Sequence, residues 1–190
     1  VVGAQMDWRD ITILRAYIRY MQQMRIPFSC PYIENALSKN PHIAQEIVHL
    51  FKALFDPANG KKAQTLAAAT NTKITKALEA VESLDQDRIL RWMSGLVNVT
   101  LRTNFFQTDE GKQPKSYLSF KLESGKIEHL PQPKPYREIF VYSPRMEGIH
   151  LRGDKIARGG IRWSDRHEDF RTEILGLMKA QQVKNSVIVP

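Results

Sequence analysis

The chain has 190 residues, 42% of them hydrophobic and 25% charged, which is typical of a globular protein with one or two domains and a sizeable core. Twenty-eight Lys and Arg residues against 20 Asp and Glu give a formal net charge of +8, which favours an anionic partner: nucleic acid, a membrane surface or small carboxylates. The single cysteine, Cys30, excludes an intrachain disulfide framework and indicates a reducing compartment, and no apolar stretch approaches the ~18 residues that span a membrane.

The first hundred residues predict a series of helices. Pro27 ends the first helix, Ser29 or Cys30 precedes the second, and Asn40 caps the third. We expect helices over residues 7–26, 31–38, 41–55, 61–83 and 84–103. Their apolar side chains recur at helical spacing, which predicts core packing. These side chains are Ile11, Leu14, Ile18 and Met21; Ile43, Ile47, Leu50 and Leu54; Leu66, Ile74, Leu78 and Val81; and Ile89, Trp92, Met93, Leu96 and Val99.

The pattern changes after Asn104. Alternating residues predict strands over 117–122, 138–142 and 148–152, with a turn at 123–126 and a stiff extended connector at 131–135. A turn at Gly153-Asp154 precedes a glycine-containing segment. Helical periodicity returns from Glu168 to Lys184, and Val187 begins a buried strand. The expected helical stripe consists of Phe170, Ile174, Leu177, Met178 and Gln181.

These elements predict an α+β or α/β protein, in which an N-terminal helical bundle precedes the truncated start of an α/β substrate-binding domain. We divide the chain into a helical subdomain over 1–104, a linker with a strand or hairpin over 105–135, and an incomplete domain over 136–190. The sequence starts Val-Val-Gly-Ala-Gln, without an initiator Met or a signal-peptide pattern, and stops where an apolar strand begins. We therefore expect a segment of a larger protein.

The Arg158-Gly-Gly-Ile-Arg162 segment and the helix that follows it suit a small anionic ligand. Gly159 and Gly160 let the backbone approach a ligand, and Gln181 and Lys184 are neighbours on one helical face. The stretch from Arg145 to Arg166 has six basic residues against three acidic ones, although a solvated face explains such a run equally well. Arg162 and Arg166 could instead pair with Asp165, Glu168 or Asp169 at the surface.

Other chemistries fit less well. The glycines do not form a Gly-x-Gly-x-x-Gly fingerprint or a P-loop, and the serines do not form a Gly-x-Ser-x-Gly elbow. His42 and His49, seven residues apart, are expected to face solvent, because metal ligation needs closer spacing and further ligands. Cys30 has no nearby base in sequence to activate it, so we expect a structural role.

Residues 140–166 and 168–190 closely resemble the large, multidomain NAD-dependent glutamate dehydrogenases of bacteria. Shorter motifs at 14–20, 27–29 and 54–57 resemble the helical region that precedes the catalytic domain in that family. The resemblance implies that residues 136–190 are the N-terminal part of a glutamate-binding catalytic domain. The small hexameric glutamate dehydrogenases share a looser form of the signature, with Lys-Gly-Gly-(Leu/Ile)-Arg followed by a helix with Gln-x-x-Lys-Asn.

The resemblance implies substrate-binding roles for Arg158, Gly159, Gly160, Gln181 and Lys184. Gln181 and Lys184 match the pair that holds the α-carboxylate of glutamate, and Gly159 and Gly160 match the turn glycines. Arg158 stands where the small enzymes have Lys, which keeps the charge but changes its reach and fork geometry. The spacing from Arg158 to Lys184 is two residues longer than in those enzymes, which an insertion within 163–169 would absorb.

The family's activity is oxidative deamination of L-glutamate to 2-oxoglutarate and ammonium, with NAD as the hydride acceptor. The resemblance implies that the catalytic Lys and the NAD-binding domain lie after Pro190, so we expect no catalytic, cofactor-binding or metal-binding residue in this chain, and no activity from it alone. It also implies a cytoplasmic homo-oligomer that binds neither nucleic acid nor membrane.

Three alternatives stay open. The pI of about 9.6 suggests a nucleic-acid-binding helical protein, although the helices mix both charge signs. The helical half could be an assembly or interaction module of a large oligomer, with an incidental pocket motif. The third alternative is another amino-acid dehydrogenase, because the position of Arg158 bears on the choice of substrate side chain.

Overall fold

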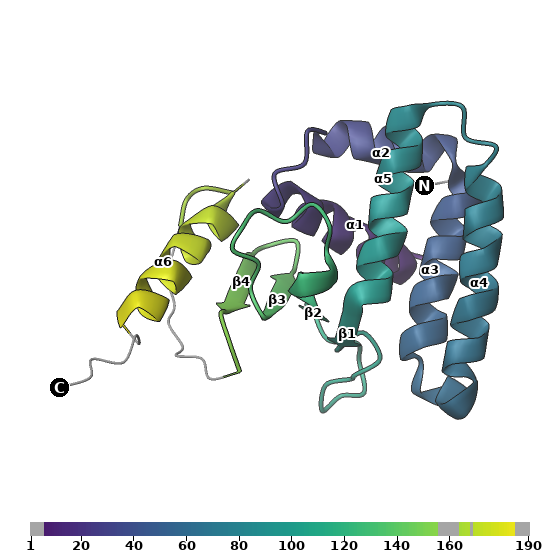
Figure 1. Cartoon of the computed structure of the whole chain (residues 1–190). Coiled ribbons are helices and arrows are strands. Elements are labelled where there is room, and N and C mark those ends of the chain that lie inside the picture. The colour runs from purple at the N-terminus through teal and green to yellow at the C-terminus, as the bar shows by residue number, and fades with distance from the viewer. Residues whose placement is uncertain (1–5, 156–163, 168, 185–190) are drawn as a thin grey trace.

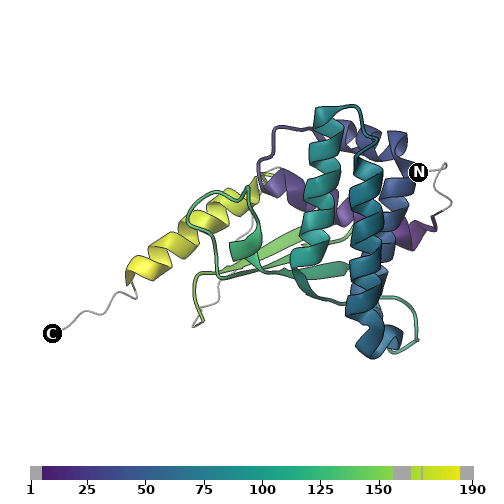
Figure 2. The ribbon, with the colours of Figure 1, turned by 45° about the vertical axis from the view of Figure 1, so that its right-hand side comes forward.

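The computed structural model describes residues 6–155, 164–167 and 169–184, with the side chains of 182–184 excepted. Helices occupy the first hundred residues, a four-stranded antiparallel sheet in the order β1-β2-β3-β4 follows, and helix α6 lies beside β4 (Figure 1). The described helices lie on one side of the sheet (Figure 2). This arrangement confirms the predicted mixture of a helical region and a sheet.

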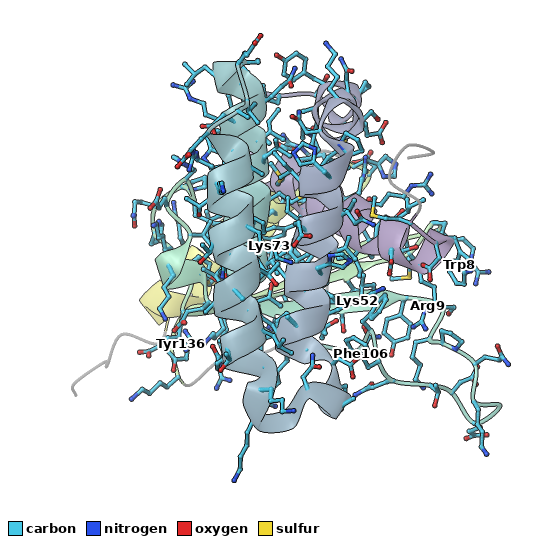
Figure 3. All side chains as sticks on the ribbon, turned by 90° about the vertical axis from the view of Figure 1, so that its right-hand side faces the viewer. Trp8, Arg9, Lys52, Lys73, Phe106 and Tyr136 are labelled. Carbon is cyan, nitrogen blue, oxygen red and sulfur yellow. The ribbon has the colours of Figure 1, made fainter. Side chains whose placement is uncertain are left out.

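The helices are α1 (Trp8–Gln23), α2 (Cys30–Lys39), α3 (Pro41–Phe55), the 3-10 helix η2 (Pro57–Lys62), α4 (Ala63–Leu78) and α5 (Leu84–Val99). Side chains cap four of them: Asp7 accepts from the amide of Asp10 at 2.8 Å, and Ser29, Asp56 and Ser83 cap α2, η2 and α5. Proline occupies the first turn of α2 and of α3. Helices α3 and α4 pack side by side, with Lys52 and Lys73 on them (Figure 3).

Two predicted helices end differently. The fourth was predicted over 61–83, but Pro57–Lys62 forms η2, with Gly60 at a φ of 47°, and α4 ends at Leu78. Leu66 was placed in its buried stripe, yet Leu66 is 43% exposed, whereas Ala67, Ile74 and Leu78 are buried. Helical phase explains the error, because the buried face of α4 passes through residue 67.

The fifth helix was predicted to reach Thr103, but α5 ends at Val99. Thr100–Thr103 forms strand β1 instead, paired with β2 (Leu118–Leu122). The Thr100 hydroxyl donates to the carbonyl of Leu96 at 2.8 Å, and the amide of Glu123 donates to the carbonyl of Val99 at 2.9 Å. Pairing with a distant strand thus ends the helix.

The other strands are β3 (Arg137–Tyr142) and β4 (Glu147–Arg152), and the 3-10 helix η3 (Ser124–Lys126) lies between β2 and β3. The three strands predicted from the alternating pattern are confirmed to within one residue. Burial alternates along β2, with Leu118, Phe120 and Leu122 facing the helices. In the described part of the chain, no helix is both long enough and apolar enough to cross a membrane.

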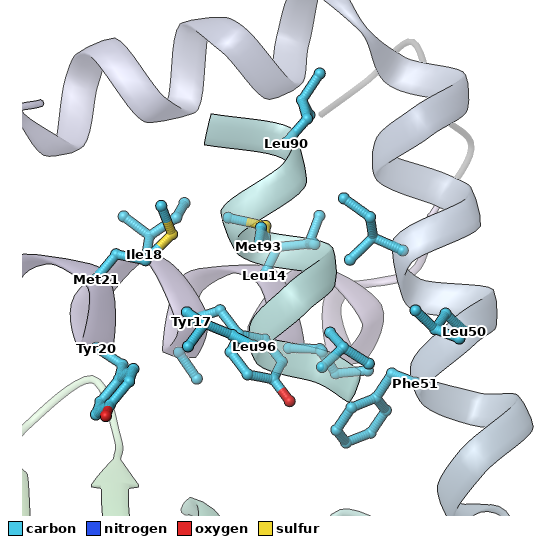
Figure 4. Packing of buried hydrophobic residues seen from close by; sticks show 14 of the residues in the cluster. Leu14, Tyr17, Ile18, Tyr20, Met21, Leu50, Phe51, Leu90, Met93 and Leu96 are labelled. Carbon is cyan, nitrogen blue, oxygen red and sulfur yellow. The ribbon is translucent and has the colours of Figure 1, made fainter. Parts of the chain in front are cut away.

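One hydrophobic core joins the helices to the sheet. Tyr17 of α1 stacks on Phe120 of β2, with ring centroids 4.2 Å apart and planes at 11°, and Phe51 of α3 meets Phe120 edge-on. Tyr17, Phe51 and Leu96 converge between α1, α3 and α5 (Figure 4). The core therefore continues across residue 104, and the domain division at that position stays a prediction.

Two buried tyrosines predict a loss of stability at alkaline pH. Tyr17 shares a 2.8 Å hydrogen bond with Thr100, and Tyr20 donates to the carboxylate of Glu138 at 2.8 Å. Burial raises the pKa of both phenols, and the negative charge of Glu138 raises the pKa of Tyr20 further. The unfolded chain releases these protons from about pH 10 and the folded chain retains them, so the free energy of unfolding falls as pH rises above about 10.

Absorbance at 295 nm and circular dichroism, followed together from pH 8 upward, test this prediction. Of the six tyrosines, Tyr17 and Tyr20 are expected to ionise only as the helical signal is lost. Tyr17→Phe should reduce the part of the absorbance change that accompanies unfolding. Complete tyrosine ionisation in a chain with native circular dichroism would contradict the assignment.

Candidate functional site

Helix α6 (Phe170–Lys184) confirms the helix predicted over 168–184. It carries two of the five predicted substrate-binding residues. Gln181 and Lys184 lie about 60° apart around its axis, on neighbouring positions of one side. The side chain of Gln181 is exposed, and that of Lys184 is outside the described part of the chain. Arg158, Gly159, Gly160 and the strand predicted at Val187 also lie outside the described residues.

Helix α6 packs on β4 through a small second core. Leu175 and Met178 of α6 are buried with Leu151 of β4. The predicted stripe is therefore wrong at Leu177, which is 41% exposed, and it missed Leu175. The buried face passes through residues 171, 175 and 178, and Leu177 and Gln181 lie on a more open face of the helix.

A buried ion pair fixes the start of α6 to the sheet. Arg171, 1% exposed, donates from Nε to Glu138 Oε2 at 2.9 Å and from Nη2 to Glu138 Oε1 at 2.5 Å. Glu138 on β3 has no exposed surface, and its Oε2 also accepts the hydroxyl of Tyr20 from α1. Burial alone would lower the pKa of Arg171, but the hydrogen bonds and charge of Glu138 outweigh burial and raise it. The Arg171 guanidinium therefore stays charged, and its contacts with Glu138, which also accepts from Tyr20, join α6, β3 and α1.

Gln23 makes a second connection between α1 and the start of α6. Its side chain, 1% exposed, donates from Nε2 to the carbonyl of His167 at 2.9 Å and accepts the amide of Arg171 on Oε1 at 3.1 Å. The accepted amide belongs to the first turn of α6, where backbone donors lack helical partners. One buried side chain thus satisfies two backbone groups and sets where the helix begins.

The sequence interpretation missed Glu138, Arg171, Tyr20 and Gln23 as a network. One signal was present: Glu138 has the same alternating phase as Phe140 on a predicted strand, so a carboxylate occupies a core position. A buried carboxylate needs a charged or hydrogen-bonding partner. Arg171, 33 residues away, could not be identified as that partner from spacing.

Surface ion pairs neutralise Arg166, as one predicted alternative suggested. Its Nε and Nη2 donate to the two oxygens of Asp169 at 2.8 and 2.6 Å, and Nε lies 3.8 Å from Glu173. The hydroxyl of Ser164 donates to Glu173 at 3.2 Å. These contacts tie Ser164 and Arg166 to α6, at the position where the chain leaves the glycine-containing segment.

The strand side of that segment is also fixed. The amide of Tyr136 donates to the carbonyl of Arg152 at 2.7 Å, next to the last pair of the β3–β4 ladder. The Arg152 guanidinium donates to the carbonyls of Asp154 and Lys155, and the amide of Lys155 donates to the Asp154 carboxylate at 2.6 Å. The residues on either side of 156–163, Lys155 and Ser164, are thus both hydrogen-bonded to the folded part of the chain.

The prediction that two histidines face solvent is confirmed, and the structural role of Cys30 stays a prediction. His42 and His49 are exposed. The Cys30 thiol lies 3.9 Å from the Arg19 guanidinium, which itself pairs with Glu147. Burial raises the pKa of Cys30 more than Arg19 lowers it. The thiol is therefore less reactive than a free cysteine, in line with a structural role.

The matched families agree on one kind of protein. A model described as the catalytic domain of bacterial NAD-glutamate dehydrogenase matches residues 73–190, and one described as glutamate dehydrogenase helical motif 3 matches residues 1–57. The gap between the two matches, 58–72, precedes the boundary predicted at residue 104.

Curated relatives carry the same description. The NAD-specific glutamate dehydrogenase of Pseudomonas aeruginosa is 54% identical over 193 residues. Those of Halomonas elongata and Mycobacterium tuberculosis are each 50% identical, over 190 and 196 residues. Each alignment covers 100% of this chain and 12% of the relative, so the chain spans about an eighth of the length of the proteins it matches.

Proposed function

The chain belongs to the family of bacterial NAD-glutamate dehydrogenases, and we propose that it supplies part of the glutamate-binding site of such an enzyme. The enzyme converts L-glutamate, NAD⁺ and water into 2-oxoglutarate, ammonium, NADH and a proton. The observation that carries the proposal is the anchoring of α6: Arg171 is paired with Glu138 on β3, and the same helix carries Gln181 and Lys184 farther along.

The anchored helix suits the binding of a carboxylate. Binding needs a fixed cation and a neutral donor on a rigid element, because freedom lost on binding weakens affinity. Lys184 provides the charge and the Gln181 amide provides N–H donors, both for the α-carboxylate. The Gln181 side chain is exposed and is not among the residues that pack α6 on β4, so it can face a ligand.

Arg158, Gly159 and Gly160 form the second half of the proposed site. Gly159 and Gly160 let the backbone pass close to the substrate, and Arg158 provides a cation for the side-chain carboxylate. The segment that contains them runs between Lys155, whose carbonyl accepts from Arg152 of β4, and Ser164, whose hydroxyl donates to Glu173 of α6. Two carboxylate contacts orient the α-carbon for hydride transfer, which is how positioning lowers the reaction barrier.

This proposal places NAD binding and the proton-transferring lysine in parts of the longer family proteins that this chain does not match. The sequence has no Gly-x-Gly-x-x-Gly fingerprint to cradle a pyrophosphate. NAD supplies the hydride acceptor, and this chain's residues bind and orient glutamate. The same proposal includes a cytoplasmic homo-oligomer. No observation on the described residues favours the alternative of a helical assembly module.

The experiment compares two polypeptides in the same assay, NADH formation at 340 nm with 2-oxoglutarate and ammonium measured in parallel. A polypeptide of the relatives' length that contains this chain is expected to form the three products in equal amounts from L-glutamate. The 190-residue chain alone is expected to form none. L-aspartate, L-leucine and L-alanine test the alternative of another amino-acid dehydrogenase, and a higher kcat/KM for any of them than for glutamate would contradict the proposal.

A further inference from the structure

The face of the sheet that points away from the described helices carries a concentration of positive charge. Arg102 on β1 is the cross-strand partner of Lys121 on β2, and Arg137 on β3 is the cross-strand partner of Arg152 on β4. Like charges directly opposite each other destabilise a sheet. Two such pairs on one face favour the binding of an anion there.

The described residues provide little compensation. Glu123 lies 3.1 Å from Arg137 and is shared with Lys126 at 2.9 Å. Arg102 and Lys121 have no ion partner among the residues that the structure describes. Among the described residues, positive charge on this face therefore exceeds the negative charge that Glu123 provides.

The same residues line a hollow of about 540 Å³, which falls in the range of about 300–1,000 Å³ typical of small-molecule pockets. Its cations come from all four strands, so they extend about 14 Å across the sheet at the usual strand spacing. Lys155 adds a further cation at one end. A single carboxylate or phosphate could contact only part of this row.

An aromatic ring lies at the β3 end of the hollow. Tyr136 is 37% exposed, and the Arg137 guanidinium covers one face of its ring at 4.3 Å. The guanidinium is thereby held in place at the rim. Tyr136 is on the opposite side of the molecule from Trp8 and Arg9 (Figure 3), so the hollow is distinct from the apolar groove near those residues.

We propose that this hollow, between Arg102, Lys121, Arg137, Arg152 and Lys155, binds a ligand with a chain of two or more phosphate groups. Linked phosphates present several charges at a spacing that cations on adjacent strands can match, and arginine pairs with phosphate oxygens through two parallel hydrogen bonds. The site takes a different anion from the proposed glutamate site and does not depend on Gln181 or Lys184.

The test measures binding of inorganic tripolyphosphate to the 190-residue chain by isothermal titration calorimetry at low ionic strength. Wild type is expected to bind one equivalent. Arg102→Glu/Lys121→Glu is expected to weaken binding about tenfold or more, because both removed cations face the ligand. Lys73→Glu/Lys76→Glu, on the exposed side of α4, makes the same change in net charge and is expected to alter affinity by about twofold or less. Circular dichroism checks that both double variants are folded.

Binding of further ligands shows whether the phosphate chain comes from a nucleotide or from a polyphosphate. Adenosine triphosphate that binds more tightly than tripolyphosphate supports a nucleotide, and equal affinity supports recognition of the phosphate chain alone. Four results would overturn the proposal: no binding to wild type, equal weakening in both double variants, displacement of tripolyphosphate by L-glutamate, or much tighter binding of an oligouridylate, which would indicate an RNA surface.

Discussion

Replacing Glu138 with alanine is expected to lower the free energy of unfolding by about 3–5 kcal/mol, because it leaves the Arg171 guanidinium buried without its counter-ion. Arg171 is 1% exposed and makes both of its described side-chain hydrogen bonds to Glu138. Tyr20 would lose its acceptor in the same change. Urea denaturation followed by circular dichroism measures the effect.

The matched control is Arg166→Ala, which breaks a two-hydrogen-bond pair in which Arg166 is 53% exposed. We expect a loss of about 0–1 kcal/mol there, since solvent screens exposed pairs. The double variant Glu138→Leu/Arg171→Met removes both charges and is expected to regain most of the lost stability. If Glu138→Ala were no more harmful than Arg166→Ala, the pair would not be what holds α6 on the sheet.

Replacing Lys184 with alanine in a polypeptide of the relatives' length is expected to lower kcat/KM for L-glutamate about 30- to 150-fold, or about 2–3 kcal/mol of lost binding. The α-carboxylate is present in the ground state and in the transition state, so most of the effect should appear as a higher KM. Lys184→Arg is expected to recover part of the loss, because it keeps the charge with a different fork geometry. Initial rates at varied glutamate measure all three proteins.

The helices and most strands could be predicted because their signals are local. Pro41 and the caps Asp7, Ser29 and Ser83 mark helix starts within a few residues of the pattern that follows. Strand β1 could not be predicted this way. Its four residues follow a helix without a break, and they become a strand because β2, about twenty residues later, pairs with them.

The candidate site also has one part that could be predicted from the sequence and another that could not. The position of Gln181 and Lys184 on one helix follows from periodicity alone. What holds that helix does not, because Glu138, Arg171 and Gln23 come from three elements and meet only in the folded chain. The cationic face could not be predicted from the sequence either. The strand register brings together residues that are spread over fifty positions: Arg102, Lys121, Arg137 and Arg152.

The comparison of Lys184→Ala with Lys179→Ala tests the central claim most directly. Both lysines are on α6, about 140° apart around the helix, and Lys179 is exposed. In the longer polypeptide, initial rates of NADH formation at varied L-glutamate and varied NAD⁺ give KM for each. We predict that KM for glutamate rises in Lys184→Ala only, with KM for NAD⁺ unchanged in both variants. An equal change in the two variants, or a change confined to NAD⁺, would contradict the assignment of this face of α6 to the glutamate α-carboxylate.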